Sequence, residues 1–182
     1  MSNARLNAVR RRMLADRVDA LWVRSTDRYL NEYVPRDEST RVWLSRFSGS
    51  MGEALVTAQS ASVFVDGRYW LQAEQEVSSE WCVVRVPHGR GIDEVVRDRL
   101  VELGAVTVGL EADRWTLQEY EALRAELPDG TAVKLLQPSP VQLAREELEP
   151  PVHPEVRESE GRREGEEPGS CGCAWRRSSP SC

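Results

Sequence analysis

The sequence predicts an α/β domain in which a mixed sheet is flanked by helices. Two observations carry this prediction. Short apolar runs typical of buried strands alternate with segments of helical periodicity along residues 1–143, and two of these runs are separated by only three residues. So short a connection requires an antiparallel pair, whereas the alternation favours parallel neighbours, so the sheet should contain both kinds of pairing.

The first element is expected to be a helix, and the second a strand. Leu6, Val9 and Met13 follow three- and four-residue spacings and, with Val18, indicate a helix ending near residues 16–20. The apolar run at residues 20–25 is typical of a buried strand.

An antiparallel pair and a helix are expected next. Residues 54–58 and 62–66 have the composition of strands, and the residues between them form a tight turn. Residues 69–77 place Trp70 and Ala73 on one helical face, so a helix should follow the second strand directly.

The remaining elements carry clear end signals. In residues 91–104 apolar side chains recur on one face, and Gly104 is a helix stop. Thr116 is expected to cap a helix at residues 116–127. The other strands are predicted at residues 81–86, 105–110 and 131–136.

The composition changes sharply near residue 144. Residues 146–182 hold nine Asp and Glu against five Lys and Arg, half of the ten prolines, and only scattered apolar residues. So few apolar side chains cannot offset the entropy lost on ordering. We therefore expect one folded domain at residues 1–143 and a disordered tail at residues 144–182. The abrupt change leads to the hypothesis of a frameshift or a truncated gene product near residue 144.

Charge and hydropathy exclude several classes of partner. A formal net charge of −6 and a pI of about 5.1 argue against nucleic acid, which selects basic surfaces. No run approaches eighteen apolar residues, and the N-terminus lacks an apolar block with a cleavage site. We expect a cytoplasmic protein without a membrane partner or a disulfide framework, since only Cys82 lies in the patterned region.

No motif for catalysis or metal binding is complete. Neither His88 nor His153 belongs to an H-E-x-x-H or comparable ligand set, and the cysteines of the CGC segment are too close together for a structural zinc site. The FSGSMGE segment lacks the first glycine of a nucleophile elbow around Ser50 and the lysine of a phosphate loop. Its glycines are better explained by a turn, so we predict no catalytic residue and no metal ligand in this chain.

Residues 25–47 and the preceding Arg24 carry nine charges, interleaved with the rings of Tyr29, Tyr33 and Trp43, and two interpretations stay open. Such a segment is either a solvated surface of weak ion pairs or a contact surface, where rings and arginines often occur together.

Arg68 is the second ambiguous feature. If Asp66 caps the helix that follows, Arg68 lies in its first turn, where a cation opposes the helix dipole. It then either pairs with Asp66 or Glu32, or binds a carboxylate or carbonyl of a ligand or of a neighbouring subunit.

Three motifs in this region resemble those of the N-terminal domain of aminopeptidase P, the Xaa-Pro aminopeptidases of the creatinase and prolidase superfamily. That family has a D-x-H-x-S-E-Y run, a G-F-x-G-S-x-G segment and a D-G-R-Y-x-x-Q-A run. Here the corresponding segments are Asp27 to Tyr33, Arg46 to Gly52 and Asp66 to Ala73, and the likeness covers about residues 5–143. Tyr29 stands where the family often has histidine.

The resemblance implies a ribonuclease-H-like fold that packs on a separate catalytic domain and takes part in dimer contacts. It implies that the parent enzyme is a metallopeptidase that binds two manganese ions and releases the N-terminal residue before proline from a peptide. By the same resemblance Arg68 is a substrate-binding residue. The other positions expected at an interface or on the substrate side are Asp27, Glu32, Tyr33, Asp66 and Tyr69.

None of the family's metal ligands can be assigned to this chain. We therefore expect no cofactor and no activity of the chain alone. Two alternatives remain: a stand-alone dimerisation or interaction module, and a domain of a creatinase or prolidase relative.

Overall fold

Six strands form one mixed sheet in the order β4-β3-β2-β1-β5-β6 in the computed structural model, which describes residues 4–31, 33–36 and 38–150. β2 is antiparallel to both β1 and β3, and the other neighbouring pairs are parallel. The predicted α/β fold with a mixed sheet is thus confirmed, including the antiparallel pair β2–β3. The strands are β1 Ala20–Val23, β2 Glu53–Thr57, β3 Ala61–Val65, β4 Cys82–Arg85, β5 Thr107–Glu111 and β6 Ala132–Leu136.

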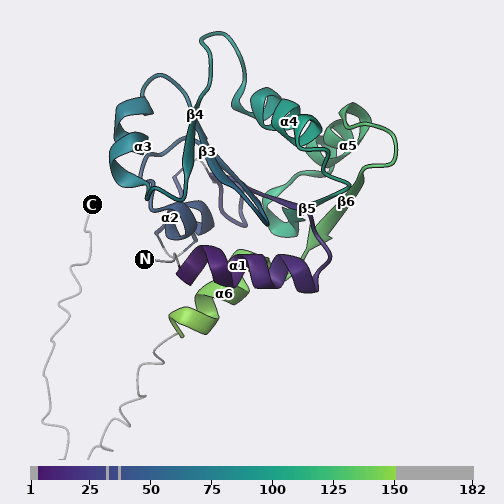
Figure 1. Ribbon diagram of the computed structural model, residues 1–182, viewed down its shortest axis with the longest axis horizontal. Coiled ribbons are helices and arrows are strands. Elements are labelled where there is room, and N and C mark those ends of the chain that lie inside the picture. The colour runs from purple at the N-terminus through teal and green to yellow at the C-terminus, as the bar shows by residue number, and fades with distance from the viewer. Residues whose placement is uncertain (1–3, 32, 37, 151–182) are drawn as a thin grey trace, which may run out of the picture. The chain divides into compact units, whose positions relative to one another are not determined.

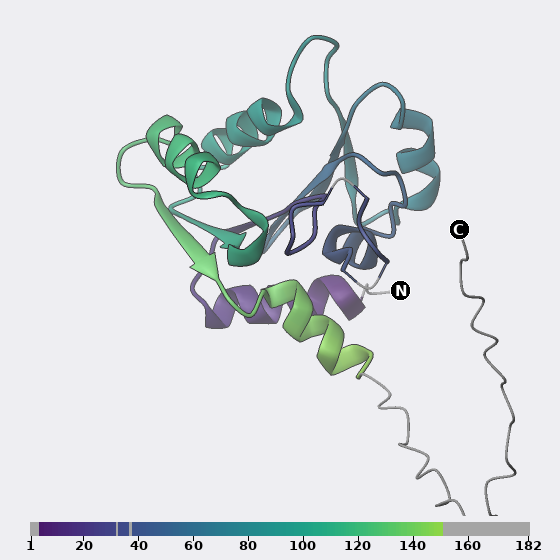
Figure 2. The ribbon, with the colours of Figure 1, turned by 180° about the vertical axis from the view of Figure 1, so that it is seen from behind.

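Helices cover both faces of the sheet (Figure 1). The first face carries α1 Ala4–Ala15, α2 Thr40–Ser45, α3 Trp70–Glu76 and α6 Pro140–Leu148, and the second carries α4 Ile92–Glu102 and α5 Leu117–Glu126. The view from behind shows α1 and α6 side by side beneath the sheet (Figure 2). A short 3-10 helix, η1 Ala112–Arg114, follows β5.

Strand alternation divides the buried side chains between two cores. In β1, Leu21 and Val23 pack against the first set of helices, and Ala20 and Trp22 pack against α4 and α5. Because both faces are covered, β1 is apolar at every position and its neighbours are largely apolar, which is why these strands could be recognised in the sequence.

The caps predicted for the second set of helices are present. The Thr116 hydroxyl accepts a hydrogen bond from the backbone N–H of Glu119, and the Glu119 carboxylate accepts one from the backbone N–H of Thr116, so α5 begins with a full capping box. Gly104 follows α4 with φ of 62°, in the left-handed region that glycine tolerates.

The end of the domain differs from the prediction. Helix α6 crosses the boundary expected between residues 143 and 144, so the prediction of a disordered tail was wrong for residues 144–148. The Ser139 hydroxyl accepts hydrogen bonds from the backbone N–H groups of Val141 and Gln142, and Pro140 occupies the first turn. The rest of the predicted tail, residues 151–182, lies outside the described residues.

A second difference lies inside residues 25–47, which contain helix α2 and not only an irregular segment. Trp43 and Leu44 of α2 join the first core, and the polar Thr40 and Arg41 are also buried.

Glu111, at the end of β5, connects this helix to the rest of the domain. Its side chain is fully buried and accepts hydrogen bonds from the hydroxyls of Thr40 (3.0 Å) and Ser139 (2.6 Å). The starts of α2 and α6 are therefore held by one carboxylate. None of the helices in the described part of the chain is long and apolar enough to cross a membrane.

Candidate functional site

The turn between β3 and α3 presents Arg68 to solvent. Asp66 follows β3, its backbone carbonyl accepts a hydrogen bond from the backbone N–H of Tyr69, and α3 begins at Trp70. The helix cap is Tyr69, without a side-chain cap bond, so the condition that Asp66 caps α3 is not met. The extra turn places Arg68 before the helix and not within its first turn.

Arg68 and Asp66 form a two-point ion pair. The Arg68 Nε donates to Asp66 Oδ1 at 3.0 Å and Nη2 donates to Oδ2 at 2.8 Å, while the backbone N–H of Arg68 also donates to Oδ1. These bonds from Arg68 lower the pKa of Asp66 and raise that of Arg68. The Arg68 side chain is 66% exposed, so the pair fixes its orientation without covering it. Of the two sequence interpretations the local pair is present, and Glu32 lies outside the described residues.

Tyr69 joins this turn to the FSGSMGE segment. Its hydroxyl and that of Ser50 share a hydrogen bond of 2.7 Å, and its ring meets the edge of the buried Phe47 ring at a centroid distance of 5.8 Å. The Arg68 guanidinium lies 5.3 Å from the centroid of the Tyr69 ring. Two of the three motifs are therefore packed together.

Helix α3 holds the same segment from its other side. The Glu76 carboxylate accepts hydrogen bonds from the backbone N–H and the hydroxyl of Ser48, at 2.7 and 2.8 Å, and Gln72 donates to that hydroxyl. Partial burial raises the pKa of Glu76, but the bonds from Ser48 and Gln72 outweigh it, and the net effect lowers the pKa. The segment is thus positioned by α3 and not by its own turn alone.

Gly49→Ala tests how tightly this segment is packed. An alanine Cβ at position 49 would lie 2.7 Å from Phe47 Cε2 and 2.9 Å from Tyr69 Cδ1, distances that real contacts do not show. We expect a loss of about 1–3 kcal/mol in the free energy of unfolding, measured by urea denaturation.

The matched control is Gly67→Ala, where the nearest side-chain atom would be 3.9 Å away and φ is not positive. This variant should unfold within about 0.5 kcal/mol of the wild type, or be slightly more stable. Equal unfolding midpoints for the two variants would contradict the packing described.

The third motif begins with Asp27, which organises its own loop. Asp27 is buried, and its carboxylate accepts hydrogen bonds from the backbone N–H groups of Tyr29 and Asn31 and from the Asn31 amide. These bonds, that from the Asn31 backbone first, lower the pKa of Asp27. These bonds hold the loop that exposes the rings of Tyr29 and Tyr33, which are 73% and 85% accessible.

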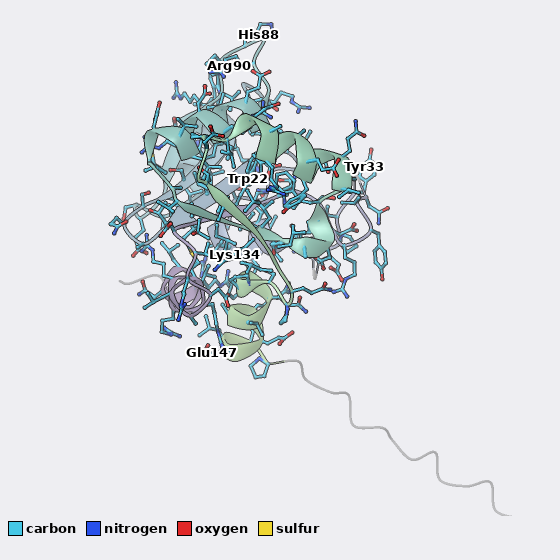
Figure 3. The ribbon with its side chains drawn as sticks, turned by 90° about the vertical axis from the view of Figure 1, so that its right-hand side faces the viewer. Trp22, Tyr33, His88, Arg90, Lys134 and Glu147 are labelled. Carbon is cyan, nitrogen blue, oxygen red and sulfur yellow. The ribbon has the colours of Figure 1, made fainter. Side chains whose placement is uncertain are left out.

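Tyr33 and the FSGSMGE segment line one hollow of about 710 Å³. Figure 3 shows Tyr33 at the edge of the molecule. The described lining of this hollow includes Ser48, Gly49 and Ser50 but not Arg68. The site residues predicted from the sequence therefore do not converge on one cavity.

Arg41 is a residue that sequence reasoning missed. It is 2% exposed, and its guanidinium donates to the backbone carbonyls of Phe47 and Gly49 and to the hydroxyl of Ser25. No local signal in the sequence marks its burial, because α2 is only six residues long and also buries the polar Thr40 and Ser45.

No group of three or more His, Cys, Asp or Glu side chains among the described residues is arranged so that it could hold a metal ion. His88 is exposed in the loop between β4 and α4, which Figure 3 shows at the far end of the molecule from Glu147. His153 lies outside the described residues. The chain's described residues therefore do not fit a pair of metal ions.

Comparison with known families and relatives gives one consistent result. The family model for the creatinase/prolidase N-terminal domain matches residues 5–141. The chain is 38% identical over 109 residues to aminopeptidase P1 of Lotus japonicus, covering 60% of this chain and 16% of that protein. It is 32% identical over 127 residues to Xaa-Pro aminopeptidase 2 of Rattus norvegicus, covering 69% of this chain and 18% of that protein. The chain thus spans less than a fifth of these relatives.

Solved structures share the fold. One is the N-terminal domain of the cytoplasmic peptidase PepQ from Mycobacterium tuberculosis H37Rv, with a TM-score of 0.61 and 27% identity over 79% of this chain and all of that one. Another is an X-prolyl aminopeptidase from Caenorhabditis elegans, described as a cytosolic enzyme with a di-nuclear active site. Its TM-score is 0.67 at 24% identity, over 79% of this chain and 25% of that one.

Proposed function

The chain belongs to the creatinase and prolidase N-terminal domain family, and from that premise we propose that it is the non-catalytic N-terminal domain of a cytoplasmic Xaa-Pro aminopeptidase, in which Arg68 contacts the peptide substrate. The named relatives support this assignment. In such an enzyme, hydrolysis would rest on a metal centre outside the residues described here, and this domain would contribute binding.

The exposed and oriented guanidinium of Arg68 carries the proposal. Asp66 occupies its Nε and one N–H of Nη2, so the outer donors remain available to a carbonyl or carboxylate. Because Asp66 and Tyr69 hold the guanidinium in place, less side-chain entropy would be lost on binding a peptide.

A titration with the tripeptide Ala-Pro-Ala, followed by NMR, tests this role. We expect the Arg68 Nε–Hε resonance to shift, and Arg68→Ala to weaken binding by about tenfold, as the loss of one charge-assisted hydrogen bond predicts. Arg85→Ala is the matched control, because Arg85 is also exposed, pairs with Glu74 and lies 5.3 Å from the centroid of an aromatic ring, that of Trp70.

The proposed substrate contact would be contradicted by equal peptide affinities of the wild type and Arg68→Ala. An equal loss of affinity in Arg68→Ala and Arg85→Ala would contradict it as well. The non-catalytic part is tested separately by incubating the wild-type chain with the same peptide and manganese. Metal-dependent release of free alanine would refute it.

A second role is supported by the exposed loop between β1 and α2. Tyr29, Leu30 and Tyr33 are 73%, 44% and 85% exposed, and we propose that they form a contact between two copies of the chain. Sedimentation velocity should show a dimer whose dissociation constant rises at least tenfold in Tyr29→Ser/Tyr33→Ser. A wild-type chain that stays monomeric at every concentration would rule the contact out.

A further inference from the structure

The hollow beside α2 is lined by five arginines that reach it from separate parts of the fold. They are Arg5 from α1, Arg36 from the preceding loop, Arg41 from α2, Arg46 from its C-cap and Arg145 from α6. None of the described lining residues is Asp or Glu, although the chain as a whole carries a formal net charge of −6. Glu149, outside the lining, pairs with Arg5 at 2.8 Å and also attracts Arg145. The excess positive charge of the hollow therefore rests on Arg36, Arg41 and Arg46.

Arg41 is buried there without a carboxylate of its own. Its hydrogen bonds go to neutral oxygens, and Glu53, whose pKa is raised to about 8, and Glu76 act on it only over a longer range. Burial lowers the pKa of Arg41 to about 10, which still leaves it protonated at neutral pH. A buried cation of this kind is stabilised by an anion that enters its surroundings.

Arg46 is kept at a position where glycine would be less strained. It is the C-cap of α2 with φ of 66°, in the left-handed region that most side chains disfavour. Its side chain is exposed, and no described carboxylate forms an ion pair with it. Attraction between Arg46 and the C-terminal dipole of a six-residue helix offsets little of the strain at this positive φ. Binding of an anion in the hollow would offset it.

The size and the remaining lining of the hollow suit a small molecule. A volume of about 710 Å³ falls in the usual range for such sites, and Val34, Val42 and Trp43 supply an apolar wall. Guanidinium groups bind phosphate with two parallel hydrogen bonds, and several of them together favour a ligand with several charges. We propose that this hollow binds a small anion carrying two or more phosphate groups.

Calorimetric titration of the full chain with inorganic tripolyphosphate tests the proposal. We expect binding that weakens as salt is added, and an affinity about tenfold lower for Arg46→Gly. Arg46→Gly relieves the positive φ while it removes the guanidinium, so the variant should fold at least as well as the wild type.

Arg17→Gly is the matched control. Arg17 also has a positive φ, 54°, just after a helix, and it does not line the hollow. This variant should bind tripolyphosphate as the wild type does. Parallel titrations with ADP and pyrophosphate separate a nucleotide from inorganic phosphate as the source, and tighter binding of either one supports the proposal.

Three outcomes would overturn it. The first is the absence of tripolyphosphate binding at about 1 mM. A hollow that binds an acidic protein segment instead would give this result. The second is unchanged affinity in Arg46→Gly. The third is equal affinity for citrate, which would show that phosphate chemistry is not recognised. None of these outcomes depends on Arg68, so they leave the proposed peptide contact to its own test.

Discussion

Replacing Glu111 with alanine is expected to lower the free energy of unfolding by about 3–5 kcal/mol, the usual cost of removing one partner from a buried ionic network. The carboxylate accepts hydrogen bonds from Thr40 and Ser139, and its Oε2 lies 3.6 Å from Nε of the buried Arg114. Without it, two hydroxyls and one buried cation lose a partner. Urea denaturation measures the loss.

Two further variants show that the cost comes from this network. Glu111→Gln keeps a hydrogen-bond acceptor for the hydroxyls, so it should cost less than alanine. Glu102→Ala removes an exposed carboxylate paired with Arg99 and should change stability by less than about 1 kcal/mol. If Glu111→Ala proved no more costly than Glu102→Ala, the network would not hold α2 and α6. Hydrogen exchange should also show faster opening of α6 in Glu111→Ala.

Glu53 should make the stability of the protein fall as the pH rises. Burial raises the pKa of Glu53 from 4.5 to about 8, and attraction to Arg24 and a hydrogen bond from the Trp22 indole only partly oppose this. Between these two pKa values the unfolded chain has released the proton and the folded chain has kept it. Each pH unit in that window therefore removes up to about 1.4 kcal/mol, and the loss ends above pH 8, where both states are ionised.

Glu53→Gln separates this effect from all other titrations, because an amide resembles the protonated acid and does not ionise. The variant and the wild type should have similar stability near pH 5, and the variant should be more stable by about 2–4 kcal/mol at pH 8. Urea denaturation at a series of pH values gives both curves. Parallel curves would mean that Glu53 is already ionised in the folded protein.

Glu119→Gln supplies a control of the opposite sign. Its carboxylate is partly buried, but hydrogen bonds from Thr116 and Arg24 lower its pKa below the ordinary value. Its stabilising contribution is present above the unfolded-state pKa and is lost as the pH falls. The glutamine variant should therefore be less stable than the wild type at neutral pH, with the difference shrinking in acid.

The strands and the two helices of the second face were predictable because their signals are local. A buried strand is an apolar run, and Thr116 and Gly104 mark helix ends by their own chemistry. Helix α2 was missed because three of its six residues, Thr40, Arg41 and Ser45, are polar and yet buried, so periodicity fails. The partners of Thr40 and Arg41 are Glu111 and the carbonyls of residues 47 and 49, which no local pattern shows.

Helix α6 was missed for a different reason. Ser139 followed by Pro140 is a helix start, and Val141 and Ala144 have apolar spacing. The acidic, proline-rich residues that follow outweighed this signal when composition was averaged over a long window. The arginine-lined hollow could not be predicted, since its five arginines come from positions 5 to 145 and only the fold brings them together.

The pairing of α1 with α6 fixes the order in which the first face can be completed during synthesis. Arg5 donates to Glu149, 144 residues later in the chain, and Val9 of α1 shares a core with Val141 of α6. Helix α1 leaves the ribosome before α6, and its apolar side stays partly uncovered until nearly the whole domain has been translated. Contacts this distant in sequence slow folding, so the nascent domain should depend on chaperones until α6 emerges.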